Sequence, residues 1–190
     1  MAKALVVVDV QNDFVEGGSL GVQGGKNVAE KIGHYVERSK GVDFDYVVTT
    51  QDWHIDPLGH FSEDPDFVNT WPVHCVADTD GAKLTQEVLD SGLWGEVDFA
   101  VRKGMYTAAY SGFEGFTEDG GGLAEILREV EVDSITVVGI ATDHCVLQTA
   151  LDGIKEGFKV DVIQELCVGI TAESSALAFK KMIEEGIKVV

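Results

Sequence analysis

The segment over residues 4–10, A-L-V-V-V-D-V, constrains the fold of this chain more than any other. It is almost continuously apolar, a pattern typical of a strand that helices cover on both faces. Further strand-like runs follow at residues 46–50, 99–102, 135–138, 159–163 and 187–190. Helical patterns separate these runs. The alternation predicts an α/β protein with a mainly parallel six-stranded sheet.

Apolar side chains at helical spacing predict the covering layers. They are Val28, Ile32, Tyr35 and Val36; Leu84, Val88 and Leu89; Leu123, Ile126, Leu127 and Val130; Val146, Ala150 and Ile154; and residues 174–185. Because 190 residues suit one domain, we expect a single three-layer α/β/α domain over residues 1–190. Sites in such folds collect beyond the carboxyl ends of the strands. The long irregular segments 11–26, 51–82 and 103–121 are therefore expected to carry function.

The net charge, the apolar runs and the cysteine content limit the partners and the compartment of this protein. A surplus of 33 acidic over 14 basic side chains gives a net charge of −19, which repels phosphate backbones and argues against nucleic-acid binding. No apolar run approaches the ~20 residues of a membrane span, and no signal-peptide pattern precedes the first strand. Three scattered cysteines form no disulfide framework. We expect a cytoplasmic protein with reduced thiols and no membrane partner; whether it forms a homo-oligomer stays open.

Cys145 follows a strand and starts a helix. The run 135–138 reads as a buried strand, Gly139 turns the chain, and Thr142 and Asp143 are good helix N-caps just before the cysteine. The amides and the dipole at a helix start favour a thiolate and can hold an oxyanion. Cys145 is therefore either a nucleophile or a buried structural cysteine.

Charged residues stand at the carboxyl ends of two other strands. Asp9 lies inside an apolar strand, where a carboxylate is costly unless it is paired or used, so it is either an anchor for loop amides or a catalytic group. Asp13 could serve instead, although its place beyond the strand favours a turn role. Lys103 is either an edge residue or a cation beside the thiol. With Cys145 the set supplies an acid, a cation and a nucleophile, and Lys103 predicts a thiol pKa below the ordinary value.

The segment after the second strand concentrates metal-ligating residues. Asp52 and His54 are two positions apart and point to the same side of an extended chain, and His60 and His74 follow on the same excursion. One carboxylate and three imidazoles suit a divalent ion such as zinc, manganese or iron. His34 lies on a predicted helix and is treated as surface.

Other features of these loops concern the ligand. The aromatic residues Phe14, Trp71 and Tyr110 could wall a flat, apolar molecule. The glycine-rich run over residues 17–25 lacks the first glycine of a Walker A loop, and Asn27 replaces its Ser or Thr. A flexible lid is therefore expected there instead of a phosphate loop.

The motifs occur in a recognisable order. They are V-V-D-V-Q-N-D-F-V-E-G-G-S-L at 7–20, D-W-H-I-D-P at 52–57 with H-F-S at 60–62, W-P-V-H-C at 71–75, K-G at 103–104, Y-S-G-F at 110–113 and G-I-A-T-D-H-C-V at 139–146. Over nearly its whole length the chain resembles the nicotinamidases (pyrazinamidases), a family of isochorismatase-like cysteine hydrolases. The resemblance implies the isochorismatase-like hydrolase fold and the hydrolysis of nicotinamide to nicotinic acid and ammonia, in NAD salvage, through a cysteine thioester. Pyrazinamide is a further substrate that the resemblance implies.

The resemblance also implies roles for particular residues. These are a catalytic triad of Asp9, Lys103 and Cys145; one divalent metal, zinc first and iron or manganese as alternatives, held by Asp52, His54, His60 and His74; an oxyanion hole from the backbone amides of Ala141 and Cys145 beside an Ile140–Ala141 cis peptide; and a substrate pocket of Phe14, Leu20, Trp71, Tyr110, Ile140 and His144.

Two alternatives stay open. One is a different hydrolase of this superfamily, such as an isochorismatase or a carbamoyl-group amidase. The isochorismatase branch lacks the aspartate and histidine set, and carbamoyl substrates need no ligand for a ring nitrogen. The other is a catalytically silent metal-binding or interaction protein, which an ammonia-release assay would distinguish.

Overall fold

Six strands form one sheet in the computed structural model, which describes residues 2–190. They are β1 (Ala2–Val8), β2 (Tyr46–Asp52), β3 (Phe99–Lys103), β4 (Val132–Ile140), β5 (Lys159–Val168) and β6 (Lys188–Val189). Their order is β3-β2-β1-β4-β5-β6, and all neighbours pair in parallel. The predicted sheet is confirmed, and β1 lies inside it between β2 and β4.

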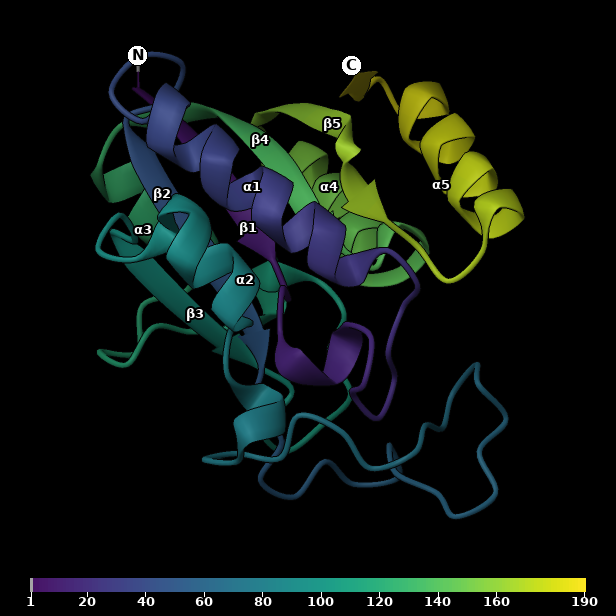
Figure 1. Ribbon diagram of the computed structural model, residues 1–190. Coiled ribbons are helices and arrows are strands. Elements are labelled where there is room, and N and C mark those ends of the chain that lie inside the picture. The colour runs from purple at the N-terminus through teal and green to yellow at the C-terminus, as the bar shows by residue number, and fades with distance from the viewer. Residues whose placement is uncertain (1) are drawn as a thin grey trace.

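Helices cover both faces of the sheet, which confirms the three-layer prediction (Figure 1). The five α-helices that the structure describes are α1 (Gly25–Ser39), α2 (Gln86–Val88), α3 (Leu123–Glu129), α4 (Leu147–Lys155) and α5 (Ala172–Glu184). A core on one face joins the sheet to α3, α4 and α5, and a core on the other face joins it to α1 and α2.

β1 shows why a parallel strand reads as a continuous apolar run. Ala4, Val6 and Val8 enter the first core, whereas Leu5 and Val7 enter the second, and all five are fully buried. Each side chain therefore needs to be apolar, whichever face it points to.

Several strand boundaries differ from the prediction: β1 ends at Val8 instead of residue 10, so Asp9 lies just beyond it, β4 extends past 135–138 at both ends, and β5 is longer at its carboxyl end. This strand continues through Val168, past the predicted end at residue 163, and includes exposed polar residues. Gln164 and Glu165 are exposed and interrupt the apolar pattern, but Leu166 is buried again, and the hydrogen-bonded ladder with β4 resumes after a register shift, at Cys167.

The carboxyl ends of the first four strands meet at one edge of the sheet. The long segments that follow β1 and β2 gather beyond that edge, at the bottom of the view in Figure 1. The approach between the central strands is close at Gly139, whose φ is +130° and where a Cβ would lie 2.1 Å from the carbonyl oxygen of Val8. Only glycine fits there. This edge is where the site lies.

No helix in the described part of the chain is long and apolar enough to cross a membrane. Cys75, Cys145 and Cys167 are all free thiols, as expected.

Candidate active site

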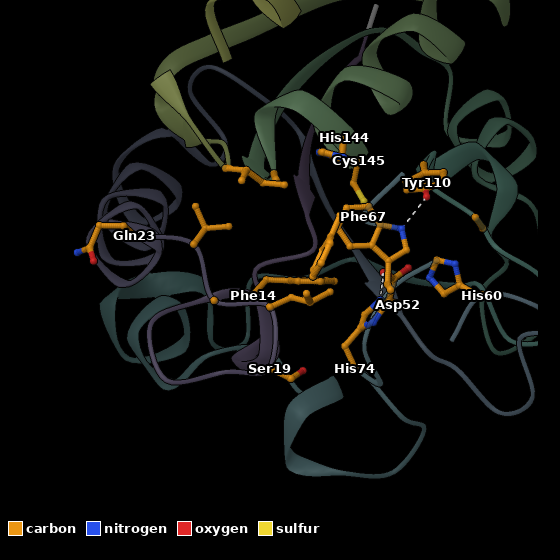
Figure 2. Close-up of a pocket in the computed structure, with 17 residues that line it drawn as sticks. Phe14, Ser19, Gln23, Asp52, His60, Phe67, His74, Tyr110, His144 and Cys145 are labelled. Carbon is orange, nitrogen blue, oxygen red and sulfur yellow. Dashed lines mark hydrogen bonds and ion pairs between the residues drawn. The ribbon is translucent and has the colours of Figure 1, made fainter. Parts of the chain in front are cut away.

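A cavity of about 440 Å³ opens at the carboxyl edge of the sheet (Figure 2). Its walls include most of the predicted pocket and parts of the predicted catalytic and metal sets. The lining residues are Phe14, Ser19, Leu20, Gly21, Val22, Gln23, Asp52, His60, Phe67, Trp71, His74, Ala109, Tyr110, Ala141, His144, Cys145 and Ile170. Ile140 is the exception among the predicted pocket residues. It shares a strand face with Val138, and both side chains are fully buried in the core that faces α1.

Lys103 lies at the centre of the polar part of the site. Its Nζ is 2.5 Å from Oδ1 of Asp52, 2.9 Å from Oδ2 of Asp9 and 3.6 Å from Sγ of Cys145. The Lys103 side chain is completely buried, and so is that of Asp9. A buried ammonium is stable only beside counter-charges, and the two carboxylates supply them. The structure thus brings the three predicted catalytic residues together.

The ionisation of this cluster differs from the sequence-based expectation in one respect. Burial raises the pKa of Cys145; Lys103 opposes the increase, but Asp9 and Asp52 add to it, and the pKa lies well above the ordinary thiol value. Burial also raises the pKa of Asp9, despite the lowering effect of Lys103. The expected low thiol pKa is therefore wrong for this structure. The thiol keeps its proton until a neighbouring base removes it.

Asp9 is placed to be that base. It leaves the strand with a left-handed φ of +49°, which is rare for a residue with a side chain and is found at functional sites. The Thr50 hydroxyl donates to its Oδ1 at 2.6 Å. Its Oδ2 contacts Lys103 but has no well-directed hydrogen-bond donor among residues 2–190. One oxygen each of Asp9 and Asp52 and the Cys145 Sγ lie within 4.8 Å of one another.

The turn that carries Cys145 is a π-helical turn, Thr142–Val146, that leads into α4. Its N-cap is Ala141, so the prediction that Thr142 or Asp143 caps the helix is wrong. The carbonyl of Ala141 instead accepts hydrogen bonds from the amides of His144 and Val146, at 3.0 and 3.1 Å. The Ile140–Ala141 peptide is cis, as the resemblance implied. Ala141 and Cys145 both line the cavity, and amides at a helix start lack partners inside the helix.

Three histidines form a group that could hold a metal ion. One ring nitrogen from each of His54, His60 and His74 lies within 4.8 Å of the others, and all three residues are buried. Oδ2 of Asp52 is 3.7 Å from Nε2 of His54 and 3.9 Å from Nε2 of His74. The two oxygens of Asp52 thus face different partners, one the ammonium of Lys103 and the other the histidines.

The hydrogen bonds of the histidines fit a metal site. Nδ1 of His54 is 2.6 Å from the carbonyl of Gly104, and Nδ1 of His74 is 2.8 Å from that of Pro72, so both rings can present a bare Nε2 inward. Nε2 of His54 and Nδ1 of His60 are buried, with no partner in the described chain. Burial lowers the pKa of His60 to about 4, and His54 and His74 add to the decrease, which keeps this imidazole neutral. Neutral, unpartnered imidazoles are what a divalent ion requires.

Gly104 supports the His54 ring. Its φ is +72°, and a Cβ there would lie 2.6 Å from Cε1 of His54. Any side chain would therefore strain the backbone and displace a predicted ligand. The Lys-Gly pair at 103–104 thus serves both the buried cation and the metal group.

Several residues that hold the site residues in place are not predicted from the sequence. Gln11 is fully buried, and its side-chain amide bonds both to the amide of Asp52, at 2.8 Å, and to its carbonyl, at 2.9 Å. The sequence signal for Gln11 is its position directly after the predicted buried strand over residues 4–10. Thr50 carried a similar one, a polar residue inside a buried strand. Asp13 anchors a distant segment instead: its Oδ2 accepts from the amide of Cys75, far along the chain, at 2.7 Å.

The cavity walls also contain residues that no pattern indicated. Phe67 and Ile170 belong to the walls although both are more than half exposed overall. The glycine-rich segment contributes residues 19–23, so it does border the site. Trp71 and Tyr110 both line the cavity, and the indole of Trp71 donates to the phenol oxygen of Tyr110 at 3.0 Å, a bond that Figure 2 marks with a dashed line at Tyr110.

Comparison with known proteins gives consistent matches over the full length. A family model described as an isochorismatase domain matches residues 3–190. A curated nicotinamidase/pyrazinamidase of Mycobacterium tuberculosis is 44% identical over 188 residues, which cover 99% of this chain and 98% of that protein. The crystal structure of a pyrazinamidase of Pyrococcus horikoshii in complex with zinc has a TM-score of 0.81 at 36% identity and covers 100% of this chain and 99% of its own. A structure from L. infantum in complex with nicotinate has a TM-score of 0.82 at 29% identity, with 100% and 92% covered.

Proposed function

The chain belongs to the isochorismatase family, and from that premise we propose that it hydrolyses nicotinamide to nicotinic acid and ammonia. The observation that carries the proposal is the meeting of Cys145, Asp9 and Lys103 with the three-histidine group at one cavity. The 44% identical relative is a nicotinamidase/pyrazinamidase, and the L. infantum neighbour holds nicotinate, which is the product of this reaction.

In the first half of the reaction, Asp9 removes the thiol proton of Cys145 as the sulfur attacks the carboxamide carbon. The raised pKa of Asp9 suits this exchange, because the carboxyl group then holds the proton until the leaving ammonia takes it. Lys103 stabilises the negative charge that passes from carboxylate to sulfur. The amides of Ala141 and Cys145 donate to the oxyanion of the tetrahedral intermediate.

In the second half, water attacks the thioester and Asp9 again accepts a proton. The carbon–sulfur bond breaks, the thiol recovers its proton, and nicotinic acid leaves. The balance is one amide and one water consumed for one acid and one ammonia. Nicotinic acid is a pyridine carboxylate, which fits a role in NAD salvage, and the free cysteines fit a reducing compartment such as the cytoplasm.

His54, His60 and His74, with Asp52 as an oxygen ligand, would hold a divalent ion. Zinc fits this donor set best, and iron and manganese are the alternatives. When bound, the ion supplies a ligand position for the pyridine nitrogen, and this orients the ring. Trp71 and Phe14, which both line the cavity, would pack against the pyridine ring, so that the carboxamide of the substrate is directed to Cys145. One chain contains all of these groups.

The test is ammonia release from nicotinamide by the purified protein and by two variants. Cys145→Ala should lower kcat by several orders of magnitude while leaving the circular dichroism spectrum unchanged. Cys167→Ala is the matched control, because this thiol lies on β5 and does not line the cavity. Wild-type protein that releases no ammonia, or a Cys145→Ala variant within about tenfold of wild type, would exclude the proposal.

A further inference from the structure

Asp143 lies two residues before the nucleophile, and it is not among the residues that line the cavity. The side chain is only 6% exposed. Both oxygens lie within hydrogen-bond distance of the amide of Ile170, at 3.2 and 3.3 Å, and the hydroxyl of Ser174 donates to Oδ2. These partners belong to the connection between β5 and α5 and to the first turn of α5. One carboxylate therefore joins the Cys145 turn to a segment almost 30 residues later in the chain.

The other side of this contact is shaped to receive the carboxylate. A Cβ at Gly169 would lie 2.8 Å from Oδ1 of Asp143, so the approach requires a glycine. The carboxylate also faces the start of a 13-residue helix, where the dipole favours negative charge. Burial raises its pKa, but the nearby His144 ring and the hydrogen bonds from Ser174 and Ile170 lower it to about 2. The group is thus ionised at any working pH.

The contact reaches two parts of the cavity. Ile170, whose amide it holds, contributes to the wall. Nδ1 of His144, whose ring packs edge-on against Trp71, lies 3.3 Å from Oδ1. The backbone of Asp143 itself belongs to the turn that contains the Cys145 amide. The carboxylate thus links the turn of the nucleophile to residues of the cavity wall.

We propose that Asp143 is a positioning residue, which fixes the turn Thr142–Val146 against the β5–α5 connection and thereby holds the Cys145 thiol and the oxyanion amides in register. The inference rests on the proposed function, since it assigns those groups their roles. Oxyanion donors act on the transition state more than on the bound amide. Loss of the Asp143 contact should therefore lower kcat and leave KM nearly unchanged.

Two variants remove the contact from opposite sides. Asp143→Asn keeps the size of the side chain and removes its charge. Ser174→Ala removes the donor on α5 without altering the nucleophile turn. We expect kcat to fall by about tenfold or more in the first and by about three- to tenfold in the second, because a misplacement of about 1 Å can cost about 100-fold. KM should change by less than about threefold in both.

The double variant separates one shared contact from two independent effects. If both residues act through it, Asp143→Asn with Ser174→Ala should be no more than about twofold slower than Asp143→Asn alone. Ile170→Ala is the control for the cavity wall, since its backbone amide still donates to Asp143; it should change KM and spare kcat. Asp152→Asn is the control for charge, since Asp152 pairs with Lys155 on α4 at 2.7 Å. It should behave as wild type.

Hydrogen exchange supplies a readout that does not depend on turnover. Amides of the turn Thr142–Val146 should exchange at least about tenfold faster in Asp143→Asn than in Asp152→Asn. Wild type that is active on nicotinamide, with variants that lose melting temperature but keep kcat within about twofold, would overturn the inference and leave the function standing. Wild type that is inactive would overturn the proposed function, and the exchange rates alone would then decide the role of Asp143.

Discussion

Replacing Lys103 by methionine tests how the buried charges of the site are balanced. Burial lowers the pKa of Lys103, but Asp52 and Asp9 more than offset this, and the pKa lies well above the ordinary lysine value. The ammonium is therefore charged at every practical pH. Methionine has a similar length and no charge, so the substitution leaves little empty space and removes the cation.

The cost follows from what is left behind. Asp9 and Asp52 have side-chain exposures of 0% and 5% and would face each other without a counter-charge. Removing one partner of a buried ion pair costs about 3–5 kcal/mol. For a chain of this size, a loss of 1 kcal/mol lowers Tm by about 2–4 °C. We therefore expect the Tm of metal-free Lys103→Met to fall by about 6–20 °C.

The pH dependence has a definite sign. Asp9 already has a folded-state pKa above its unfolded value, and the loss of Lys103 raises it further, so over the interval between the two values the folded protein binds more protons than the unfolded chain. The free energy of unfolding then decreases as pH rises through that interval. The penalty of Lys103→Met should be larger at pH ~7.5 than at pH ~4.5, just above the ordinary carboxyl values.

Urea unfolding of chelator-treated, reduced protein measures this penalty, with Asp9→Asn and the double variant as companions. Adding Asp9→Asn to Lys103→Met removes one unpaired carboxylate and should restore about 1–3 kcal/mol. A penalty below about 1 kcal/mol at both pH values would refute the reasoning. So would a double variant less stable than Lys103→Met alone.

Three further predictions concern the thiol, the metal group and the substrate. In metal-free protein, iodoacetamide labelling of Cys145 should have its midpoint above the ~8.5 of a free thiol, and Asp9→Asn should move it downward by removing a negative charge; a wild-type midpoint below the free value would contradict the raised pKa. Gly104→Ala should lower the metal content found by elemental analysis, because the new Cβ collides with the His54 ring. The control is Gly120→Ala, which has a φ of +88° and open space around it and should keep the metal. Equal metal contents in the two variants would count against the collision. Nicotinamide should be preferred over benzamide by up to ~10⁴-fold in kcat/KM, and His54→Ala should remove most of that preference; a wild-type ratio near one would exclude selection through the ring nitrogen.

Much of the site could be predicted because its residues follow strands. Asp9, Lys103 and Cys145 are far apart in the sequence, but the carboxyl ends of neighbouring parallel strands meet at one edge. The grouping of the three histidines is easier to predict, because all three follow a single strand. In both cases a local pattern, combined with one rule of topology, was enough.

What could not be predicted depends on packing between distant segments. The pKa of Cys145 is set by its burial and by two carboxylates, and no local pattern reports their net effect. The partners of Asp143 lie on another element, so its sequence context suggested a helix cap instead. Ile140 is different. Its alternation with Val138 on one strand face already placed it in the core, and the family pattern outweighed that signal.

The place of β1 between β2 and β4 has a consequence for biosynthesis and for engineering. The first 120 residues contain Asp9, the three histidines and Lys103, but the nucleophile is on the turn after β4. A nascent chain therefore has no catalytic activity until β4 has been synthesised and has paired with β1, late in translation. The exposed turn at Gly120 would divide the protein into two pieces, neither of which holds a complete site. Recovered ammonia release would then report that two fused partners had brought the halves together.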